Sequence, residues 1–414
     1  MSPVVKIFPT RPIFTHPTQS AITRKGQDCS RELPTLNPPT PTLVHALDHQ
    51  DEKFSSAFSI LTEAIAVRAF PAASIAITHR DRLIALKSFG HFTYESDSPP
   101  VTPTTLFDLA SLTKAVATTT MAMILYQRGQ LELEVPVVGV VPEFKTDASG
   151  SPDSRRPEIT FRMLLAHSSG LPAYEKLFLK AHSRDDLLQA AFTTPLSADP
   201  ASRAEYSDIG FILLGTALER IAGESLDVFC QREIFGPLAM IHTTFNPPPA
   251  TRKEIPPTAD DRSFRNRIIQ GEVQDENASV LGGVAGHAGL FSTAQDLARF
   301  AHAVLHGGRP ILRPEIVALF TRRESAPPGT SRALGWDTPS APSQSGKYFG
   351  SRSFGHLGYT GTSLWIDPDR QLSVTLLTNR TWPDCSSQLI KQVRPRFHDA
   401  VIEALGSNLA SNND

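Results

Sequence analysis

The pattern of apolar and polar positions predicts two β-hairpins, one toward each end of the chain. In SIAITHRDRLIALK, apolar and polar residues alternate on both sides of HRDR. This alternation predicts two strands, Ser74–Thr78 and Leu83–Lys87, joined by a turn. A second such segment places the proline-bearing turn DPDR between Ser363–Ile366 and Leu372–Leu377.

Helical periodicity dominates elsewhere. Apolar residues at helical spacing predict an amphipathic helix in SAFSILTEAIAVRAF, just after Phe54, and a terminal helix over about 386–405. Between the two hairpins the same spacing predicts helices near 112–128, 161–166, 185–193, 209–223, 226–234 and 294–305.

Strand pairs at both ends with helices between them predict an α/β (α+β) fold. The two ends would meet in one antiparallel sheet flanked by the terminal helices, and the middle would form an inserted helical subdomain. We expect one domain over 54–406, with a sheet subdomain from about 54–100 and 330–406 and a helical subdomain from about 105–325. Residues 1–45 are interpreted as a disordered, proline-rich leader. The active cleft is expected where sheet and helices meet.

Composition excludes several classes of function. The chain has 40 Lys+Arg against 42 Asp+Glu, a net charge of −2, which gives no reason to expect a nucleic-acid or anionic-membrane partner. No apolar run approaches the ~18 residues of a membrane span. Cys29, Cys230 and Cys385 are odd in number and form no CxxC pair, which predicts neither a disulfide framework nor a zinc site.

The N-terminus has no apolar signal core, which favours the cytoplasm over export; the compartment and the oligomeric state stay open.

Ser111-Leu112-Thr113-Lys114 is the only SxxK in the chain. If Ser111 begins a helix, Lys114 lies one turn on, on the same face. A serine alcohol is a poor nucleophile unless a neighbour takes its proton, and a lysine can do so only when burial or a nearby charge makes it neutral. The helix start also offers a free N–H to an oxyanion. Because one SxxK is expected by chance in a protein of this length, an ordinary capped helix is the alternative.

Two further motifs have the same kind of ambiguity. Tyr206-Ser207-Asp208 precedes an apolar helix; a phenol near a lysine can share its proton, or Asp208 can simply cap the helix. His356-Leu357-Gly358 precedes Tyr359 and a strand. Here glycine would let the backbone approach a ligand, with the N–H of Tyr359 as an oxyanion donor, or the segment is only a glycine-rich turn.

The ordered set SLTK, YSD and HLG, with ITFRMLLAHSSGLP and LGGVAGHAGLFST between its members, resembles the β-lactamase and penicillin-binding-protein superfamily over nearly all of 54–406. It is most similar to class C β-lactamases and to their penicillin-binding, esterase and D-aminopeptidase relatives. The resemblance implies that Ser111 is the acylated nucleophile and that Lys114 and Tyr206 share the proton transfer. It also implies an oxyanion hole formed by the N–H groups of Ser111 and Tyr359, and the fold outlined above.

Two residues depart from the superfamily pattern. Asp208 replaces the usual asparagine; its charge favours the ammonium form of Lys114 and leaves more of the base role to Tyr206. His356, beside Gly358, stands where many members have lysine or histidine. An imidazole of ordinary pKa about 6.5 would hold a substrate carboxylate less firmly than a lysine.

Other candidate residues follow from the same resemblance or from spacing. His287, in a segment similar to penicillin-binding protein 4B-type carboxypeptidases, either acts directly or braces a loop beside the cleft, and Asn277 is expected to approach the substrate. His167 is expected to cap a helix and set a turn. His302 and His306 have zinc-like i, i+4 spacing, but no third ligand is evident in the sequence, so a solvated helix face is expected and no metal is predicted.

We therefore expect acyl transfer through a covalent seryl ester, on a β-lactam or a D-amino-acid peptide amide, with no metal or organic cofactor. The partner is a small-molecule or peptide substrate. A short-chain carboxylesterase using the same site is the first alternative. A non-catalytic sensor or scaffold is the second, although a scaffold has no physical need for Ser111, Lys114 and Tyr206 together.

Overall fold

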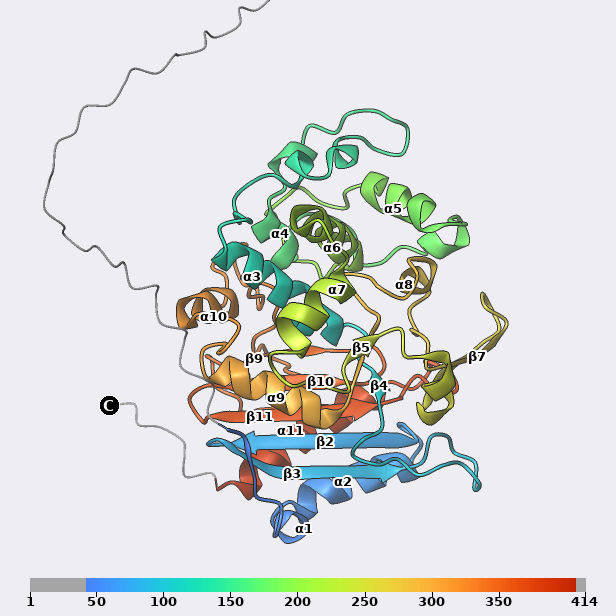
Figure 1. The fold of residues 1–414 in the computed structure, drawn as a ribbon, viewed down its shortest axis with the longest axis vertical. Helices are drawn as coiled ribbons and strands as arrows, with labels where there is room; N and C mark the ends of the chain where they lie inside the picture. The colour runs from blue at the N-terminus through green and yellow to red at the C-terminus, as the bar shows by residue number, and fades with distance from the viewer. Residues whose placement is uncertain (1–41, 407–414) are drawn as a thin grey trace, which may run out of the picture. The chain divides into compact units, whose positions relative to one another are not determined.

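A six-stranded sheet is the centre of the fold (Figure 1). The structure, a computed structural model, describes residues 42–406. Strands β2 (Ala72–His79) and β3 (Arg82–Gly90) form one predicted hairpin, and β10 (Ser363–Asp367) and β11 (Leu372–Thr378) form the other. Strands β2 and β11 pair antiparallel. The prediction that both ends of the chain meet in one sheet is therefore confirmed.

The two edge strands were not predicted. Strand β1 (Val44–His45) pairs parallel with β3, and β9 (Phe354–Leu357) pairs antiparallel with β10. A two-residue strand is too short to show alternation, and Gly355, which lies against Trp365, interrupts the apolar pattern of β9. Strand β1 falls inside the predicted leader, whose residues 1–41 lie outside the described part of the chain.

The two faces of the sheet bury different cores. Helices α2 (Ser55–Ala66) and α11 (Ile390–Ala404) pack together against one face, and α9 (Ala294–Leu305) packs against the other. Because successive strand residues point to opposite faces, Ile75 of β2 joins the core under α2 and α11, whereas Ala76 joins the core shared with the helical region. The predicted covering of the sheet by the terminal helices is confirmed.

The helical region lies on the α9 side of the sheet (Figure 1). Its central helix α6 is capped by Ser207, whose Oγ accepts from the N–H of Gly210, and it ends at Gly223 in the left-handed conformation. The helices are α3 (Thr120–Gln127), α4 (Phe161–Leu165), α5 (Arg184–Thr193), α6 (Asp208–Ala222), α7 (Leu226–Cys230), α8 (Glu276–Val280), α10 (Pro314–Thr321), the π-helical turns Lys114–Thr119 and Gln231–Phe235, and, outside this region, α1 (Gln50–Lys53).

Short strands and 3₁₀ turns complete the chain between the hairpins. Strands β4, β8 and β5 form a small antiparallel sheet, and β6 and β7 form a hairpin. The strands are β4 (Phe107–Asp108), β5 (Thr244–Phe245), β6 (Pro257–Asp261), β7 (Arg267–Gln270) and β8 (Leu290–Ser292), and the 3₁₀ turns are Val137–Gly139, Pro142–Lys145, Arg156–Glu158, Leu177–Leu179 and Pro249–Glu254. Among the described residues, no helix combines the length and the apolar character that a bilayer crossing needs.

One expectation about α9 was wrong. His302 is only 4% exposed and His306 is half-buried, so the two histidines do not form a solvated face. The β2–β3 turn covers this end of the helix and brings Asp81 beside both imidazoles. Sequence spacing could not reveal this contact, because the turn and the helix are more than two hundred residues apart.

Candidate active site

Ser111 is held at the entrance to a helix by a buried carboxyl group. Asp108 accepts hydrogen bonds from the backbone N–H groups of Ala110 (2.8 Å) and Gln274 (2.7 Å). Ala110 adopts a left-handed conformation (φ 47°), which is uncommon for a residue with a side chain. Burial raises the pKa of Asp108 to about 6. This anchored turn directs the half-buried Ser111 into the cleft, three residues before the π-helical turn that begins at Lys114.

Lys114 is fully buried and donates toward Ser111 from one helical turn away. Its Nζ lies 2.9 Å from Ser111 Oγ, 2.9 Å from the carbonyl oxygen of His287 and 2.6 Å from Asp208 Oδ1. Burial lowers the pKa of Lys114, but the charge of Asp208 and the phenol of Tyr206 outweigh it, so the pKa is raised. At rest Lys114 is therefore an ammonium, and Asp208 opposes its conversion to a free base.

The phenol of Tyr206 completes a three-residue group with Ser111 and Lys114. The Lys114 Nζ lies 4.9 Å from the centroid of the Tyr206 ring. Burial raises the pKa of Tyr206, and the charge of Lys114 together with side-chain hydrogen bonds to Lys114 and Ser111 only partly offsets it. The structure thus brings together the three residues that the sequence placed on two distant segments.

His167 holds the backbone on both sides of Tyr206. Its carbonyl oxygen accepts from the N–H of Glu205 (2.8 Å), and its Nδ1 accepts from the N–H of Ser207 (3.0 Å). The imidazole also packs against the Tyr206 ring, with 4.7 Å between centroids. Burial lowers the pKa of His167 well below its ordinary value, so the ring is neutral and remains an acceptor. His167 was expected to set a turn; in the structure, its contacts orient the loop that contains Tyr206.

The turn after β9 is fastened to the segment that precedes Ser111. The Thr360 hydroxyl donates to the carbonyl of Asp108 (2.7 Å), and the Thr362 hydroxyl donates to the carbonyl of Leu109 (2.9 Å). A Cβ on Gly358 would lie 1.9 Å from Thr362 Oγ1 and 2.4 Å from the Leu109 oxygen, so only glycine fits. Thus the two backbone segments that would supply an oxyanion hole are held by the same hydrogen bonds.

The backbone N–H groups of Ser111 and Tyr359 have no acceptor within residues 42–406. Both residues line one cavity of about 790 Å³, together with Tyr206, His356 and Gly358. Free N–H groups beside a nucleophile are what a developing oxyanion requires. The geometry is therefore compatible with the predicted oxyanion hole.

His356 is a neutral hydrogen-bond acceptor. It is 3% exposed, and its Nδ1 lies 2.8 Å from the carbonyl oxygen of Leu357. Because a carbonyl oxygen only accepts, Nδ1 has the proton and Nε2 has a lone pair. Burial, helped by the charge of Lys114, lowers the pKa of His356 to about 3. This imidazole offers no proton to a substrate carboxylate near neutral pH.

Arg332 is a cation of the cavity that sequence reasoning missed. Its guanidinium carbon lies 5.5 Å from the centroid of the Tyr206 ring. Its ion pair with Asp337 is long, 3.6 Å between Nη1 and Oδ1, so guanidinium N–H groups remain available to a ligand. No motif surrounds Arg332 in the sequence, and only the packing of its loop against Tyr206 reveals it.

His287 and Asn277 lie behind the cavity wall and do not line it. The carbonyl of His287 positions Lys114, and its Nε2 lies 2.8 Å from Oδ1 of Asp275, a cavity residue that was not predicted. Asn277 accepts from the N–H of Phe178 (3.0 Å) and donates to the carbonyl of Glu175 (2.8 Å). Of the two roles expected for His287, its position fits the one of bracing a loop beside the cavity. Asn277 holds the loop of Glu175 and Phe178 in place and does not line the cavity, so it does not approach the substrate as expected.

Comparison with known proteins identifies the family. The sequence profile described as Beta-lactamase matches residues 59–390. The chain belongs to the β-lactamase family. This result confirms the resemblance inferred from SLTK, YSD and HLG, and it confirms the fold class.

Two relatives of this β-lactamase family member are named as enzymes that cleave amide bonds. It is 31% identical to an N-acetylmuramyl-L-alanine amidase of Bacillus subtilis (strain 168) over 344 residues, which cover 75% of this chain and 77% of the relative. It is 30% identical to a putative D-alanyl-D-alanine carboxypeptidase of Salmonella agona (strain SL483), covering 75% and 79%. The family assignment thus places the chain among hydrolases.

Solved structures show the same fold at lower identity. EstCE1, a hydrolase with promiscuous acyltransferase activity, aligns with a TM-score of 0.69 at 21% identity, covering 85% of this chain and 99% of that one. The octameric penicillin-binding protein homologue from Pyrococcus abyssi aligns with a TM-score of 0.65 at 21% identity, covering 84% and 77%. At these identities the match concerns the fold alone.

Proposed function

We propose that this β-lactamase family member is a serine hydrolase that forms an acyl-enzyme on Ser111. The observation that supports this most is the 2.9 Å contact between Lys114 Nζ and Ser111 Oγ, in a cavity that the Tyr206 phenol also lines. A side-chain amine and a phenol around one accessible hydroxyl can take its proton as it attacks a carbonyl.

In the proposed reaction, Ser111 Oγ bonds to the substrate carbonyl carbon while its proton passes to the Lys114–Tyr206 pair. The N–H groups of Ser111 and Tyr359 hold the negative oxygen. As the tetrahedral intermediate collapses, the bond to the leaving group breaks and the pair returns the proton to it. Water then attacks the ester carbonyl, the bond between the acyl carbon and Ser111 Oγ breaks, and the acyl group leaves as a carboxylic acid while Ser111 regains its proton.

The protonation state of Lys114 and Tyr206 in the free protein limits how readily they accept the proton of Ser111. Both members of the Lys114–Tyr206 pair have raised pKa values, so at neutral pH both hold their protons. The pair must first release one proton to solvent or substrate before it can accept that of Ser111. We therefore expect acylation to become faster as pH rises through the alkaline range.

We propose a β-lactam or a D-amino-acid peptide amide as the substrate class. Both have a carboxylate beside the scissile amide, and the neutral acceptor His356 cannot bind it. Arg332 can, because a guanidinium binds a carboxylate through two parallel N–H groups. The names of the amidase and carboxypeptidase relatives also favour an amide.

A short-chain carboxylesterase is the second candidate. The same neutral His356 favours it, since an ester without a carboxylate needs no cation at that corner of the cavity. A non-catalytic sensor or scaffold is disfavoured, because burying Lys114 beside Asp208 and Tyr206 has a desolvation cost that packing alone does not require.

Intact-mass spectrometry distinguishes these alternatives. Wild type, Ser111→Ala and the exposed-serine control Ser351→Ala would each be exposed to a fluorophosphonate and, separately, to a penicillin. We expect both reagents to add one acyl or phosphonyl group to wild type and Ser351→Ala, and none to Ser111→Ala.

A stable penicillin adduct would indicate a penicillin-binding protein, and rapid turnover of the adduct would indicate a β-lactamase. Labelling by the fluorophosphonate alone would favour the esterase. Labelling by neither reagent, or undiminished labelling of Ser111→Ala, would contradict the proposed nucleophile.

A further inference from the structure

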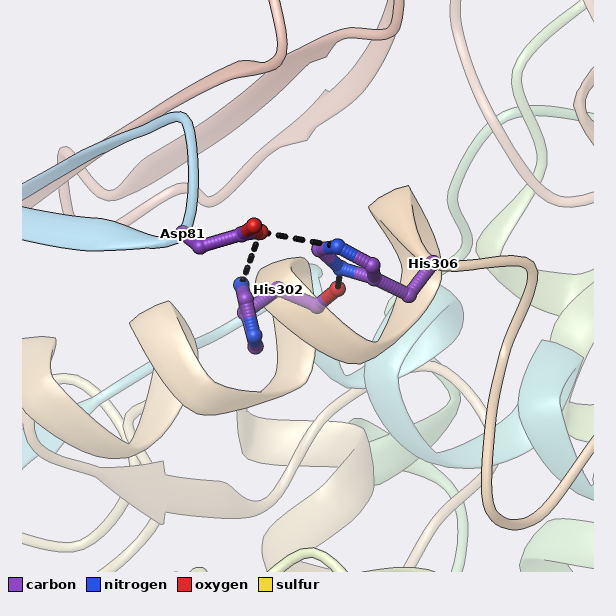
Figure 2. A group of neighbouring side chains, drawn as sticks. All are labelled: Asp81, His302 and His306. Atoms are coloured by element: carbon purple, nitrogen blue, oxygen red, sulfur yellow. Dashed lines mark hydrogen bonds and ion pairs between the residues drawn. The ribbon is translucent and has the colours of Figure 1, made fainter. Parts of the chain in front are cut away.

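Two imidazoles and a carboxylate converge where the β2–β3 turn meets the end of α9 (Figure 2). His306 Nε2 lies 2.8 Å from Asp81 Oδ1, and His302 Nδ1 lies 4.0 Å from the same oxygen. One ligand atom from each of the three residues lies within 4.8 Å of the others. Figure 2 shows the Asp81 carboxylate directed toward both rings.

The hydrogen bonding of His306 makes this arrangement suited to a cation. Its Nδ1 lies 2.8 Å from the carbonyl oxygen of His302. That oxygen can only accept, so Nδ1 has a proton. In the neutral ring, Nε2 then has no proton, and its lone pair faces the lone pairs of Asp81 Oδ1, which is a repulsive contact. Only a second proton on His306, or a cation bound by both atoms, makes this contact attractive. A metal-binding histidine commonly has its other nitrogen fixed in this way by a carbonyl.

We propose that Asp81, His302 and His306 form a binding site for a divalent transition metal, with zinc as the metal that the ligands fit. Two imidazole nitrogens and one carboxylate oxygen are a common zinc set, with water in the fourth position. Histidines at i and i+4 lie on one face of a helix, and the fold supplies the third ligand that the local sequence lacks.

The three ligand atoms, which lie within 4.8 Å of one another, must adjust to bind one ion. Zinc–ligand bonds of about 2.0–2.1 Å at tetrahedral angles separate neighbouring ligand atoms by about 3.3 Å. The contact of Asp81 with His306 is shorter than this, and its contact with His302 is longer. The Asp81 side chain is 50% exposed, so it can move to equalise the two distances.

The site would join the hairpin to the helix. Both histidines lie at the C-terminal end of α9, where the helix dipole favours a cation. None of the three ligands lines the cavity that contains Ser111. We therefore expect the metal to fasten the β2–β3 turn to α9 and to take no part in the chemistry at Ser111.

Zinc titration of the full chain tests this site. Chelator-treated protein would be titrated with Zn²⁺ by calorimetry, and its melting temperature would be measured with and without the metal. Wild type should bind one equivalent and melt at a higher temperature when loaded. Asp81→Asn and His306→Gln should each bind at least about tenfold more weakly and lose the thermal shift.

Asp81→Asn suits the fold, because Asp81 has a φ of 63° and asparagine tolerates that conformation. His182→Gln, at an exposed histidine, is the control and should bind zinc as wild type does. Absence of a zinc-dependent shift in wild type would overturn the site. So would equal binding by Asp81→Asn and His306→Gln, which would place the metal elsewhere.

A salt bridge without metal makes a different prediction. If His306 is simply protonated and paired with Asp81, Asp81→Asn lowers the melting temperature in the presence of chelator, and zinc changes neither protein. That result would replace the metal site with an ion pair.

Discussion

The two sides of the cleft present different kinds of group to a substrate. On the helical side, Lys114 and Asp208 form a close ion pair beside the Tyr206 phenol. On the sheet side, next to Gly358, lie the neutral imidazole of His356 and the backbone N–H of Tyr359. The helical side is therefore suited to moving protons, and the sheet side to holding a negative oxygen without exchanging one.

The difference also explains how each side is kept in place. The helical side depends on single contacts from distant segments, such as the backbone carbonyl of His287 on Lys114 and the His167 ring on Tyr206. The sheet side depends on backbone geometry, which the Thr360 and Thr362 hydroxyls fasten to the segment before Ser111. Substitutions on the two sides should consequently change different measured quantities.

The largest effect is expected from Gly358→Ala on the sheet side. The new Cβ would collide with Thr362 Oγ1 and the Leu109 carbonyl and displace the Tyr359 N–H. Loss of one oxyanion donor should lower kcat/KM by about 10²–10³. The measurement is steady-state kinetics with whichever substrate class labels Ser111.

Two further variants separate catalysis from folding in this prediction. Gly350→Ala is the matched control, since its Cβ would meet only Arg370 Nη1 at 3.8 Å. Thr362→Val keeps the side-chain shape, removes the hydroxyl bonded to Leu109, and should lower kcat/KM even if Gly358→Ala does not fold. Wild-type kcat/KM in both Gly358→Ala and Thr362→Val would contradict the assigned oxyanion donor.

A smaller effect, confined to KM, is expected from Arg332→Gln. Losing a charge-assisted hydrogen bond of about 1.5–3 kcal/mol should raise KM roughly 10–100-fold for a substrate with a carboxylate. A neutral ester should be affected little. Arg352→Gln, at a largely exposed ion pair with Asp369, is the control. An equal change in KM for charged and neutral substrates would mean that Arg332 does not bind the carboxylate.

The smallest effect is expected from Asp208→Asn on the helical side, as a shift in pH dependence. Asp208 raises the pKa of Lys114, and the base must be deprotonated to act. Removing the charge lowers that pKa, so the acid limb of the pH–rate profile should move to lower pH. The profile is measured as the rate of fluorophosphonate labelling of Ser111.

Glu276→Gln is the control for this shift, because Glu276 lines the cavity but forms no ion pair with Lys114. An acid limb that stays in place in Asp208→Asn, or that moves equally in both variants, would show that Lys114 does not set it.

Local sequence determined much of this protein. The alternating segments around HRDR and DPDR specified two hairpins, because alternation with a turn between is a local property. The SxxK spacing placed Lys114 one helical turn from Ser111 for the same reason, and the observed 2.9 Å contact agrees with it. The order of SLTK, YSD and HLG was enough to recognise the family, which the profile over 59–390 confirms.

Only the tertiary structure decided the surroundings of these motifs. Burial made His356 neutral, whereas its sequence neighbours left its charge open. Folding placed Arg332 over Tyr206, turned Asn277 into a loop clamp, and brought Asp81 from a hairpin turn to two histidines of a distant helix. Burial and long-range contact are properties of the packed chain, so no local pattern of residues could have specified them.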